Sequence, residues 1–539
     1  MTEHKHIGKI VGALMAAAVA FCLIVTLFAD RFVAVSGSSA TTMEYESTLF
    51  DTSEIMTVNI IMDEDQWQEL LDNAISEEYY ACDVEINGEM ISNVGIRAKG
   101  NTSLSSIAND PDTDRYSFKI KFDKYVDGQT CMGLDKLVLN NNFADATNRK
   151  EALVYDMFQY LGADASLYNY AKISVNGEYW GTYLALEAVE DSFKLRNYGV
   201  SDGKLYKPET MGMGNDQKED GGKPDGNPPE RPNNADFPSS EEGDLAKDNN
   251  PMDRPERPQG DFDQADMDEK FRNPQGDPGD FGNRNGGADL NYTDDDADSY
   301  STIWDGADGK VTDSDKERVV TAIKNINEGT NLTTYLDVDN ILKYMAVHEF
   351  VVNLDSLSGN MAHNYYLYEN DGQLNIIPWD YNLSFGGMTN GEMGGGPKRN
   401  STENSGATGM INDPIDTPFD GTDFFDALLE NEEYLAQYHE YLRQLAEEYV
   451  QGGRLQEVWE RLDAQTDELI ETDPTAFYTA AEYEEAKETL WTVLQLRAES
   501  VLGQLDGTIP STDDGQQNAQ DTLIDGSAID LSVMGEFNH

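Results

Sequence analysis

The sequence predicts an α+β protein in which a β-rich lobe is followed by a helical lobe, with a disordered acidic insertion between them and one transmembrane helix in front. Three observations predict this arrangement. Alternating apolar runs separated by Asn-Gly turns fill residues 55–208. Residues 209–300 are rich in Pro, Gly, Asn and Asp, a composition that cannot bury a core. Residues 301–505 then carry apolar side chains at helical spacing.

The charge of the chain excludes one large class of function. The 539 residues include 38 Lys and Arg against 101 Asp and Glu, which gives a formal net charge of −63. Because nucleic acids are held by Lys and Arg that neutralise phosphates, this balance excludes a non-specific nucleic-acid binder. It favours cations and basic substrates instead. Three cysteines exclude a disulfide scaffold, and Cys82 and Cys131 either pair or remain two isolated thiols.

Residues 10–29 predict a membrane-spanning helix that anchors the chain. They carry no charged side chain and match the ~20 residues that a helix needs to cross the hydrocarbon core. Lys5 and Lys9 precede this run, so the positive-inside rule places residues 1–9 in the cytoplasm. The chain is then expected outside, after a linker over residues 30–54. A cleaved signal peptide is the alternative, although the run exceeds the usual 7–15 residues and no clean cleavage site follows.

The β-rich lobe is expected to contain two helices among its strands. The expected strands are residues 55–62, 80–86, 90–99, 116–122, 136–140, 171–175 and 179–187, and the expected helices are residues 63–73 and 148–161. Two hairpins turn at Asn-Gly pairs, Asn87-Gly88 and Asn176-Gly177. Apolar and polar side chains alternate in the fourth strand, which predicts a polar face that presents Lys119 and Lys121. Thr147 is the expected cap of the second helix.

The helical lobe is expected to begin near residue 301. Helices are expected over residues 315–327 and 336–352, followed by a hairpin that turns at Asp371-Gly372. Residues 424 to about 504 are expected to be helical throughout. The polar, acidic tail over residues 506–539 is predicted to be disordered.

The stretch from Phe350 to Gly387 concentrates the residue types that support phosphoryl transfer. Asp355 lies in a polar loop after a helix, and Asp380 directly follows the second strand of the hairpin. Because a tight hairpin returns the chain on itself, the two carboxylates are expected to meet. Phosphoryl transfer needs one Asp to orient the attacking hydroxyl, and a second Asp with an Asn to hold Mg²⁺. The Asp355 to Asn360 interval fits the D-x-x-x-x-N spacing of kinases, which is weak by itself.

Two histidines, His348 and His363, lie close to these residues in the chain. Neither has a partner at the spacing of a zinc site, since His348-Glu349 lacks the second His of H-E-x-x-H. We therefore expect both histidines to be structural.

Seven motifs along the chain carry a family resemblance. They are GIRAKGNTS (Gly95–Ser103), YSFKIKF (Tyr116–Phe122), LNNNFADATNRKEALVYDMF (Leu139–Phe158), NGEYWGTYLALEAVEDSF (Asn176–Phe193), KLYKPE (Lys204–Glu209), HNYYLY and IPWDYNLSFGG. Together they resemble the CotH kinase family, the spore-coat-type atypical protein kinases, from about residue 55 to 450. The resemblance implies a two-lobe, protein-kinase-like fold with nucleotide between the lobes. It also implies phosphorylation of Ser or Thr in proteins with ATP and Mg²⁺, or with Mn²⁺ in its place.

The resemblance also assigns catalytic and metal-binding roles. Asp355 is expected to be the catalytic base, and Asp380 is expected to be the metal-binding aspartate. Asn360 and Asn364 compete for the metal-binding amide, since the spacing favours Asn360 whereas Asn364 belongs to the HNYYLY motif.

Further residues are expected to hold the nucleotide. Lys119 or Lys121 would pair with the phosphates, and Lys119 is preferred because it lies deeper in its strand. Glu151 would be the ion-pair partner of that lysine. Phosphate cover and adenine contacts are expected from Arg97, Lys99 and the segment from Glu187 to Val189.

Two functions from different classes follow from these features. The first is a membrane-anchored protein kinase on the outside of a bacterial cell or spore, acting on a basic protein that contains Ser or Thr. The alternative is a non-catalytic surface-binding or adhesion protein that keeps the same fold. The scarcity of ATP outside cells favours the alternative, whereas the presence of both aspartates and both candidate amides favours the enzyme.

Overall fold

Seven strands close into a barrel in the computed structural model, which describes residues 41–210, 286–359, 362–387, 406–419 and 421–535. The strand order is β1-β2-β3-β4-β5-β7-β6, and the ring closes because β6 pairs in parallel with β1. The strands are β1 Met56–Ile61, β2 Tyr80–Ile86, β3 Glu89–Lys99, β4 Ser117–Lys121, β5 Lys136–Asn140, β6 Tyr168–Val175 and β7 Glu178–Glu187.

Alternation of side chains along these strands builds the barrel interior. Phe118 and Ile120 of β4 are fully buried in a core that the barrel strands share, as the alternation predicts. The two Asn-Gly turns are also confirmed. Asn87 and Gly88 have φ of 49° and 83°, and Asn176 and Gly177 have φ of 51° and 85°. Two successive positive φ angles match the right-handed twist of a two-residue hairpin.

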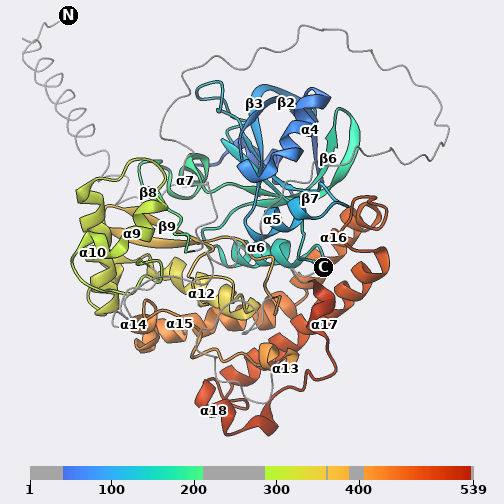
Figure 1. The fold of residues 1–539 in the computed structure, drawn as a ribbon. Coiled ribbons are helices and arrows are strands. Elements are labelled where there is room, and N and C mark those ends of the chain that lie inside the picture. Colours follow the sequence, from blue (N-terminus) through green and yellow to red (C-terminus); the bar gives the residue numbers. More distant parts are fainter. Residues whose placement is uncertain (1–40, 211–285, 360–361, 388–405, 420, 536–539) are drawn as a thin grey trace, which may run out of the picture.

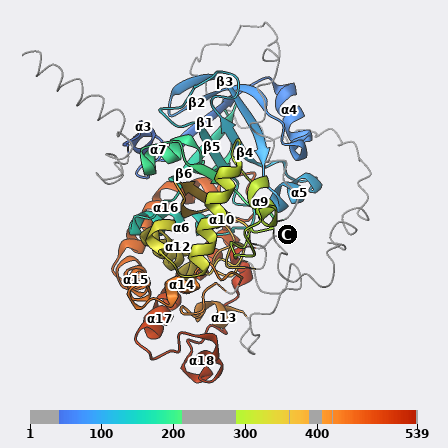
Figure 2. The ribbon, with the colours of Figure 1, turned by 90° about the vertical axis from the view of Figure 1, so that its left-hand side faces the viewer.

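Most of the helices lie below the barrel in Figure 1, although a few pack beside its strands, and the perpendicular view of Figure 2 shows the same division. Between the two parts lies α6 (Lys150–Leu161), which contacts β6 above and α12 (Val338–Val351) below. The remaining helices are α3 Glu44–Thr48, α4 Glu64–Asp72, α5 Thr102–Asn109, α7 Asp191–Tyr198, α9 Ser301–Asp305, α10 Asp313–Asn327, α11 Leu332–Tyr335, α13 Ala407–Ile411, α14 Asp426–Leu429, α15 Glu432–Arg443, the π-helical η4 Gln444–Val450, α16 Arg454–Glu471, α17 Ala480–Leu505 and α18 Asp513–Gln517.

A second, three-stranded sheet joins segments from both sides of the insertion. Its order is β10-β9-β8, with β8 at Lys204–Tyr206, β9 at Tyr365–Asn370 and β10 at Gln373–Pro378. The β9–β10 hairpin turns at Asp371-Gly372, as predicted. Because β8 pairs with β9, the residues that follow β8 are brought to the hairpin that Asp380 follows.

The structure corrects the predicted fold class. The protein-kinase-like two-lobe fold is wrong, because the seven strands close into a barrel with helices packed beside it. The predicted transmembrane segment, residues 10–29, lies outside the described residues. Within the described residues, no helix is both long and apolar enough to cross a bilayer. Cys82 and Cys131 are buried, separate thiols.

Three boundaries also differ from the prediction. Residues 286–300, expected to be disordered, form turns and a short helix and bury Leu290 and Tyr300 in the helical core. Residues 506–535 form α18 and two 3₁₀ turns and bury Met534. The expected continuous helix from residue 424 is broken into separate helices, with a loop between α16 and α17. A few apolar side chains in polar sequence therefore suffice to order these segments.

Candidate active site

The N-terminus of α6 is capped by side chains that precede the helix. Asp145 Oδ2 accepts hydrogen bonds from the main-chain N–H groups of Arg149 and Lys150, both at 3.0 Å. Thr147, the expected cap, contributes through its Oγ, which accepts from the same Arg149 N–H at 3.0 Å. This paired cap fixes the first turn of the helix, where Glu151 lies.

A polar bridge connects the outer face of the barrel to Glu151. The strand register places Lys99 of β3, Ser117 of β4 and Asn140 of β5 in one row across this face. Lys99 Nζ donates to Asn140 Oδ1 at 2.7 Å, and Asn140 Nδ2 donates to Glu151 Oε2 at 2.8 Å. The other carboxylate oxygen, Oε1, is buried without a hydrogen-bond partner among the described residues.

Asp380 lies beside this bridge, directly after β10. Its φ of 60° is in the left-handed region, which residues other than glycine rarely adopt. Burial raises the pKa of Asp380, which the positive charge of Lys99 opposes and the nearby Asp355 reinforces. Burial, together with the charge of Asp380, raises the pKa of Glu151 to about 7. The negative charges of these buried carboxyl groups are thus compensated only in part by water or by positive charges of the protein.

Asp355 is anchored in the loop that follows α12. His363 Nε2 lies 2.6 Å from Asp355 Oδ1. Asn364 Nδ2 donates to Asp355 Oδ2 at 3.1 Å and to the Asp355 carbonyl oxygen at 2.8 Å. Burial lowers the pKa of His363, but the hydrogen bond and the charge of Asp355 outweigh burial and raise it. The charges of Asp355 and Asp380 act on each other, so the hairpin returns both carboxylates to one site, as expected.

The two lysines preferred from the sequence lie on the same outer face as Lys99 but in other rows. Lys119 lies opposite Arg97, and Lys121 lies opposite Gly95. Successive rows on one face of a sheet are about 6.6–6.8 Å apart. The bridge to Glu151 therefore starts from Lys99, which was expected from the family resemblance to cover the nucleotide phosphates.

The remaining residues expected at the site lie in three different places. Arg97 is buried and forms an ion pair with Glu77 at 2.8 Å. Glu187 is buried, with Arg196 at 2.6 Å and the Tyr45 hydroxyl at 2.6 Å. Its main-chain N–H donates to the carbonyl oxygen of Leu167, the residue before β6, at 2.9 Å. Asn360 lies outside the described residues.

Several residues of the site had no role in the sequence analysis. Lys207 and Glu209 form an ion pair at 2.7 Å just after β8. Lys207 acts electrostatically on Asp380, and Glu209 acts on His363. Both belong to the KLYKPE motif, and this motif is the sequence feature that could have identified them. Their place near Asp380 follows from the pairing of β8 with β9 across the insertion, which no local pattern encodes.

Left-handed backbone gathers around these residues. Positive φ angles other than at glycine occur at Val352 (49°), Ala362 (47°), Asn364 (56°), Asp380 (60°) and Phe385 (58°). For a β-branched residue such as Val352 this conformation is a genuine outlier. Strained backbone of this kind is typical of functional sites, where the surrounding packing holds it in place.

The donor set fits a metal that arrives with a nucleotide. Within the described ranges, no group of three or more His, Cys, Asp or Glu side chains is arranged to hold a metal ion. Mg²⁺ commonly uses one or two carboxylates plus substrate phosphates and water. Asp380 supplies such a carboxylate, Asn364 supplies an amide, and Glu151 Oε1 supplies a buried oxygen without a hydrogen-bond partner in the described part of the chain.

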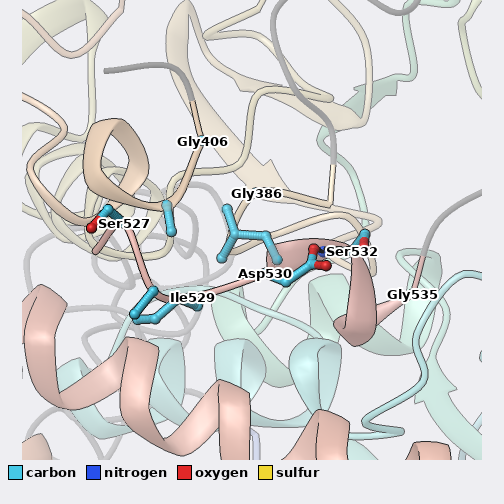
Figure 3. A pocket seen from close by; sticks show the side chains of 10 residues that line it. Gly386, Gly406, Ser527, Ile529, Asp530, Ser532 and Gly535 are labelled. Carbon is cyan, nitrogen blue, oxygen red and sulfur yellow. Dashed lines mark hydrogen bonds between the residues drawn. The ribbon is translucent and has the colours of Figure 1, made fainter. Parts of the chain in front are cut away.

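A cavity of about 380 Å³ lies under the C-terminal segment, and Asp355, Asp380 and Glu151 are not among the residues that line it (Figure 3). Gly386, Gly406 and residues 527–532 line it. Asp530 points to its own turn, since Oδ1 accepts from Ser532 N and Oγ at 3.0 and 2.6 Å. The same segment reaches the start of α6, because the Met534 carbonyl oxygen accepts from the N–H of Ala146 at 3.1 Å.

Comparison with known families identifies a match over most of the chain. A family model described as CotH kinase protein matches residues 96–501, from β3 of the barrel into α17. The matched range includes Lys99, Glu151, Asp355 and Asp380. No curated protein matches the chain.

Proposed function

This chain belongs to the CotH kinase protein family, and on that premise we propose that it transfers the γ-phosphoryl group of ATP to Ser or Thr of a protein substrate. The observation that carries the proposal is the meeting of Lys99, Asp355 and Asp380 at one site, reached from three distant parts of the sequence. Phosphoryl transfer depends mostly on positioning and on neutralising charge, and these residues supply both kinds of group.

On the nucleotide side, Lys99 is the proposed phosphate-binding cation. Asn140 and Glu151 hold its ammonium group toward Asp380, which supports Lys99 over Lys119 and Lys121. Asp380 and Asn364 would hold Mg²⁺, or Mn²⁺ in its place. When bound, the metal would neutralise charge on the phosphate oxygens.

On the substrate side, Asp355 is the proposed base that orients the attacking hydroxyl. His363 and Asn364 fix both of its carboxylate oxygens, so the group is held in one orientation before substrate arrives. Its side chain remains 13% exposed, which leaves it accessible to a hydroxyl. Positioning of this kind supplies a large share of the rate acceleration.

A transfer assay tests the proposal. The purified protein is incubated with labelled ATP and Mg²⁺ or Mn²⁺, alone and with a basic Ser/Thr-rich protein, beside Asp380→Asn and Asp355→Asn. We expect transfer by the parent and a loss of about 10³-fold or more in each variant. Asp416→Asn is the matched control, because Asp416 binds His439 Nε2 at 2.7 Å in a pair of the same geometry outside the site.

The outcomes separate the two functional classes. If the parent and all three variants transfer phosphate equally well, the transfer is due to another kinase in the preparation. A parent that neither transfers phosphate nor binds nucleotide would favour the non-catalytic surface-binding protein instead.

The substrate is proposed to be basic because the chain carries a formal net charge of −63. Long-range attraction between opposite charges weakens with salt. The apparent second-order rate constant for a basic substrate should therefore fall as ionic strength rises, and a rate that does not change would contradict the proposal. The extracytoplasmic location at a bacterial cell or spore surface stays a prediction.

A further inference from the structure

His348, in the last turns of α12, is buried between the two loops that carry the aspartates. On one side, its Nδ1 lies 3.0 Å from the hydroxyl of Tyr381. On the other side, its Nε2 lies 2.7 Å from Ser358 Oγ and 3.1 Å from Ser356 Oγ. Tyr381 directly follows Asp380, and Ser356 directly follows Asp355.

The contacts around His348 favour one neutral tautomer of its ring. The hydroxyls of Ser356 and Ser358 both donate to the carbonyl oxygen of Asn353, at 3.0 and 2.9 Å. Because each hydroxyl has a single hydrogen, neither can donate to the imidazole at the same time. With both serine hydrogens on that carbonyl oxygen, Nε2–H donates to the serine oxygens and Nδ1 accepts the Tyr381 hydroxyl proton. Burial lowers the pKa of His348 to about 3, which keeps the imidazole neutral at working pH.

Both ends of this chain of hydrogen bonds make further contacts. At one end, Asn353 Oδ1 accepts the main-chain N–H of Asp355 at 3.3 Å, so the serine cluster and the Asp355 loop share Asn353. At the other end, the Tyr381 ring packs edge-on against Phe158 of α6, with centroids 5.4 Å apart. A change at the imidazole is therefore transmitted to both loops.

We propose that His348 is a positioning residue that holds Asp355 and Asp380 in the relative placement that phosphoryl transfer requires. This inference rests on the proposed function. His348 itself touches neither substrate nor nucleotide, and it acts through Ser356 and Ser358 on one aspartate and through Tyr381 on the other.

A double-mutant cycle tests the inference. Tyr381→Phe removes the hydroxyl that is hydrogen-bonded to His348 Nδ1 while keeping the ring, and we expect it to lower kcat about tenfold, the effect of losing one buried hydrogen bond. In a His348→Leu background, Tyr381→Phe should cost less than about twofold, because the imidazole that the hydroxyl contacts is already absent and the contact with Tyr344 does not reach the Asp355 loop. Effects that multiply instead would mean that the hydroxyl acts without His348, and would overturn the proposal.

Controls separate positioning from loss of fold. Tyr438→Phe removes a buried hydroxyl that donates to the Ile415 carbonyl at 2.9 Å, away from both aspartates. It should lower thermal stability about as much as Tyr381→Phe while leaving kcat unchanged. His348→Gln, which keeps a polar donor and acceptor, replaces His348→Leu in the cycle if the leucine variant does not fold.

A second readout needs no phosphoryl transfer. The affinity for Mn²⁺ in the presence of a non-hydrolysable ATP analogue depends on the placement of Asp380, so Tyr381→Phe and His348→Leu should both weaken it, and Ser356→Ala should not. A parent that binds Mn²⁺ and nucleotide without transferring phosphate overturns the proposed function, and this readout still decides the role of His348. Unchanged Mn²⁺ affinity in His348→Leu, or no binding by the parent, overturns the inference.

Discussion

The same strands supply the interior and the outer face of the barrel, but the two faces carry different kinds of side chain. On β4, Phe118 is fully buried inside, whereas Lys119 lies half-buried outside. On β5, Leu139 faces the interior, and the neighbouring Asn140 carries the bridge from Lys99 to Glu151. Apolar burial in the interior stabilises the fold, while the outer face contacts a buried carboxyl on α6, that of Glu151, whose pKa is raised to about 7, which costs stability. Stability and chemistry are thus assigned to opposite faces of one sheet.

Truncation of an interior residue should have the largest effect on folding. Phe118→Ala removes a fully buried ring from the barrel core, so we expect a loss of about 3–5 kcal/mol in the free energy of unfolding. Denaturant unfolding measures this loss. Lys119→Ala, one residue further on the opposite face, is the control and should change it by less than about 1 kcal/mol. Equal losses in the two variants would show that the two faces do not differ in their contribution to stability.

Removal of the bridging lysine should affect activity rather than folding. Lys99→Met keeps the length of the side chain but loses the ammonium group, and we expect kcat/KM for ATP to fall about 100-fold, or about 2.7 kcal/mol. Lys121→Met, two rows away on the same face, should lower it by no more than a few-fold. A larger loss in Lys121→Met than in Lys99→Met would return the phosphate-binding role to Lys121.

The smallest effect is expected from the pH dependence of Glu151. Its pKa is raised from 4.5 to about 7 in the folded protein. Between these values the folded state holds a proton that the unfolded chain has lost, so stability falls as pH rises through this window. Glu151→Gln should therefore be more stable than the parent by about 2 kcal/mol at pH 6 and equally stable near pH 4. Thermal unfolding across pH measures the gap, and a gap independent of pH would contradict it.

The elements of the barrel follow from local sequence, but its closure does not. Two of its turns carry Asn-Gly pairs, and the alternation in β4 gives its two faces. Closure depends on the parallel pairing of β1 with β6, which are far apart in the chain. Local patterns do not encode such a pairing, which is why the expected two-lobe fold was replaced by a barrel.

The same distinction applies to the site. The hairpin between Asp355 and Asp380 is local, so their approach could be expected from the sequence. The alternation in β4 gives the face on which Lys119 lies, but the row that reaches Glu151 depends on the register of three strands. Lys207 comes to the site through a strand pairing across the insertion. These contacts join segments whose separation hides them from any local pattern.

The hydrogen bond between Ala146 and Met534 can form only late in the synthesis of the chain. Ala146 leaves the ribosome long before Met534, and at about 5–20 residues per second the interval between them is roughly 20–80 seconds. During that time the start of α6 lacks a partner that the finished molecule gives it. A copy that is cut or terminated before residue 534 keeps every residue proposed for catalysis, yet it has not acquired the contact that secures the helix of Glu151.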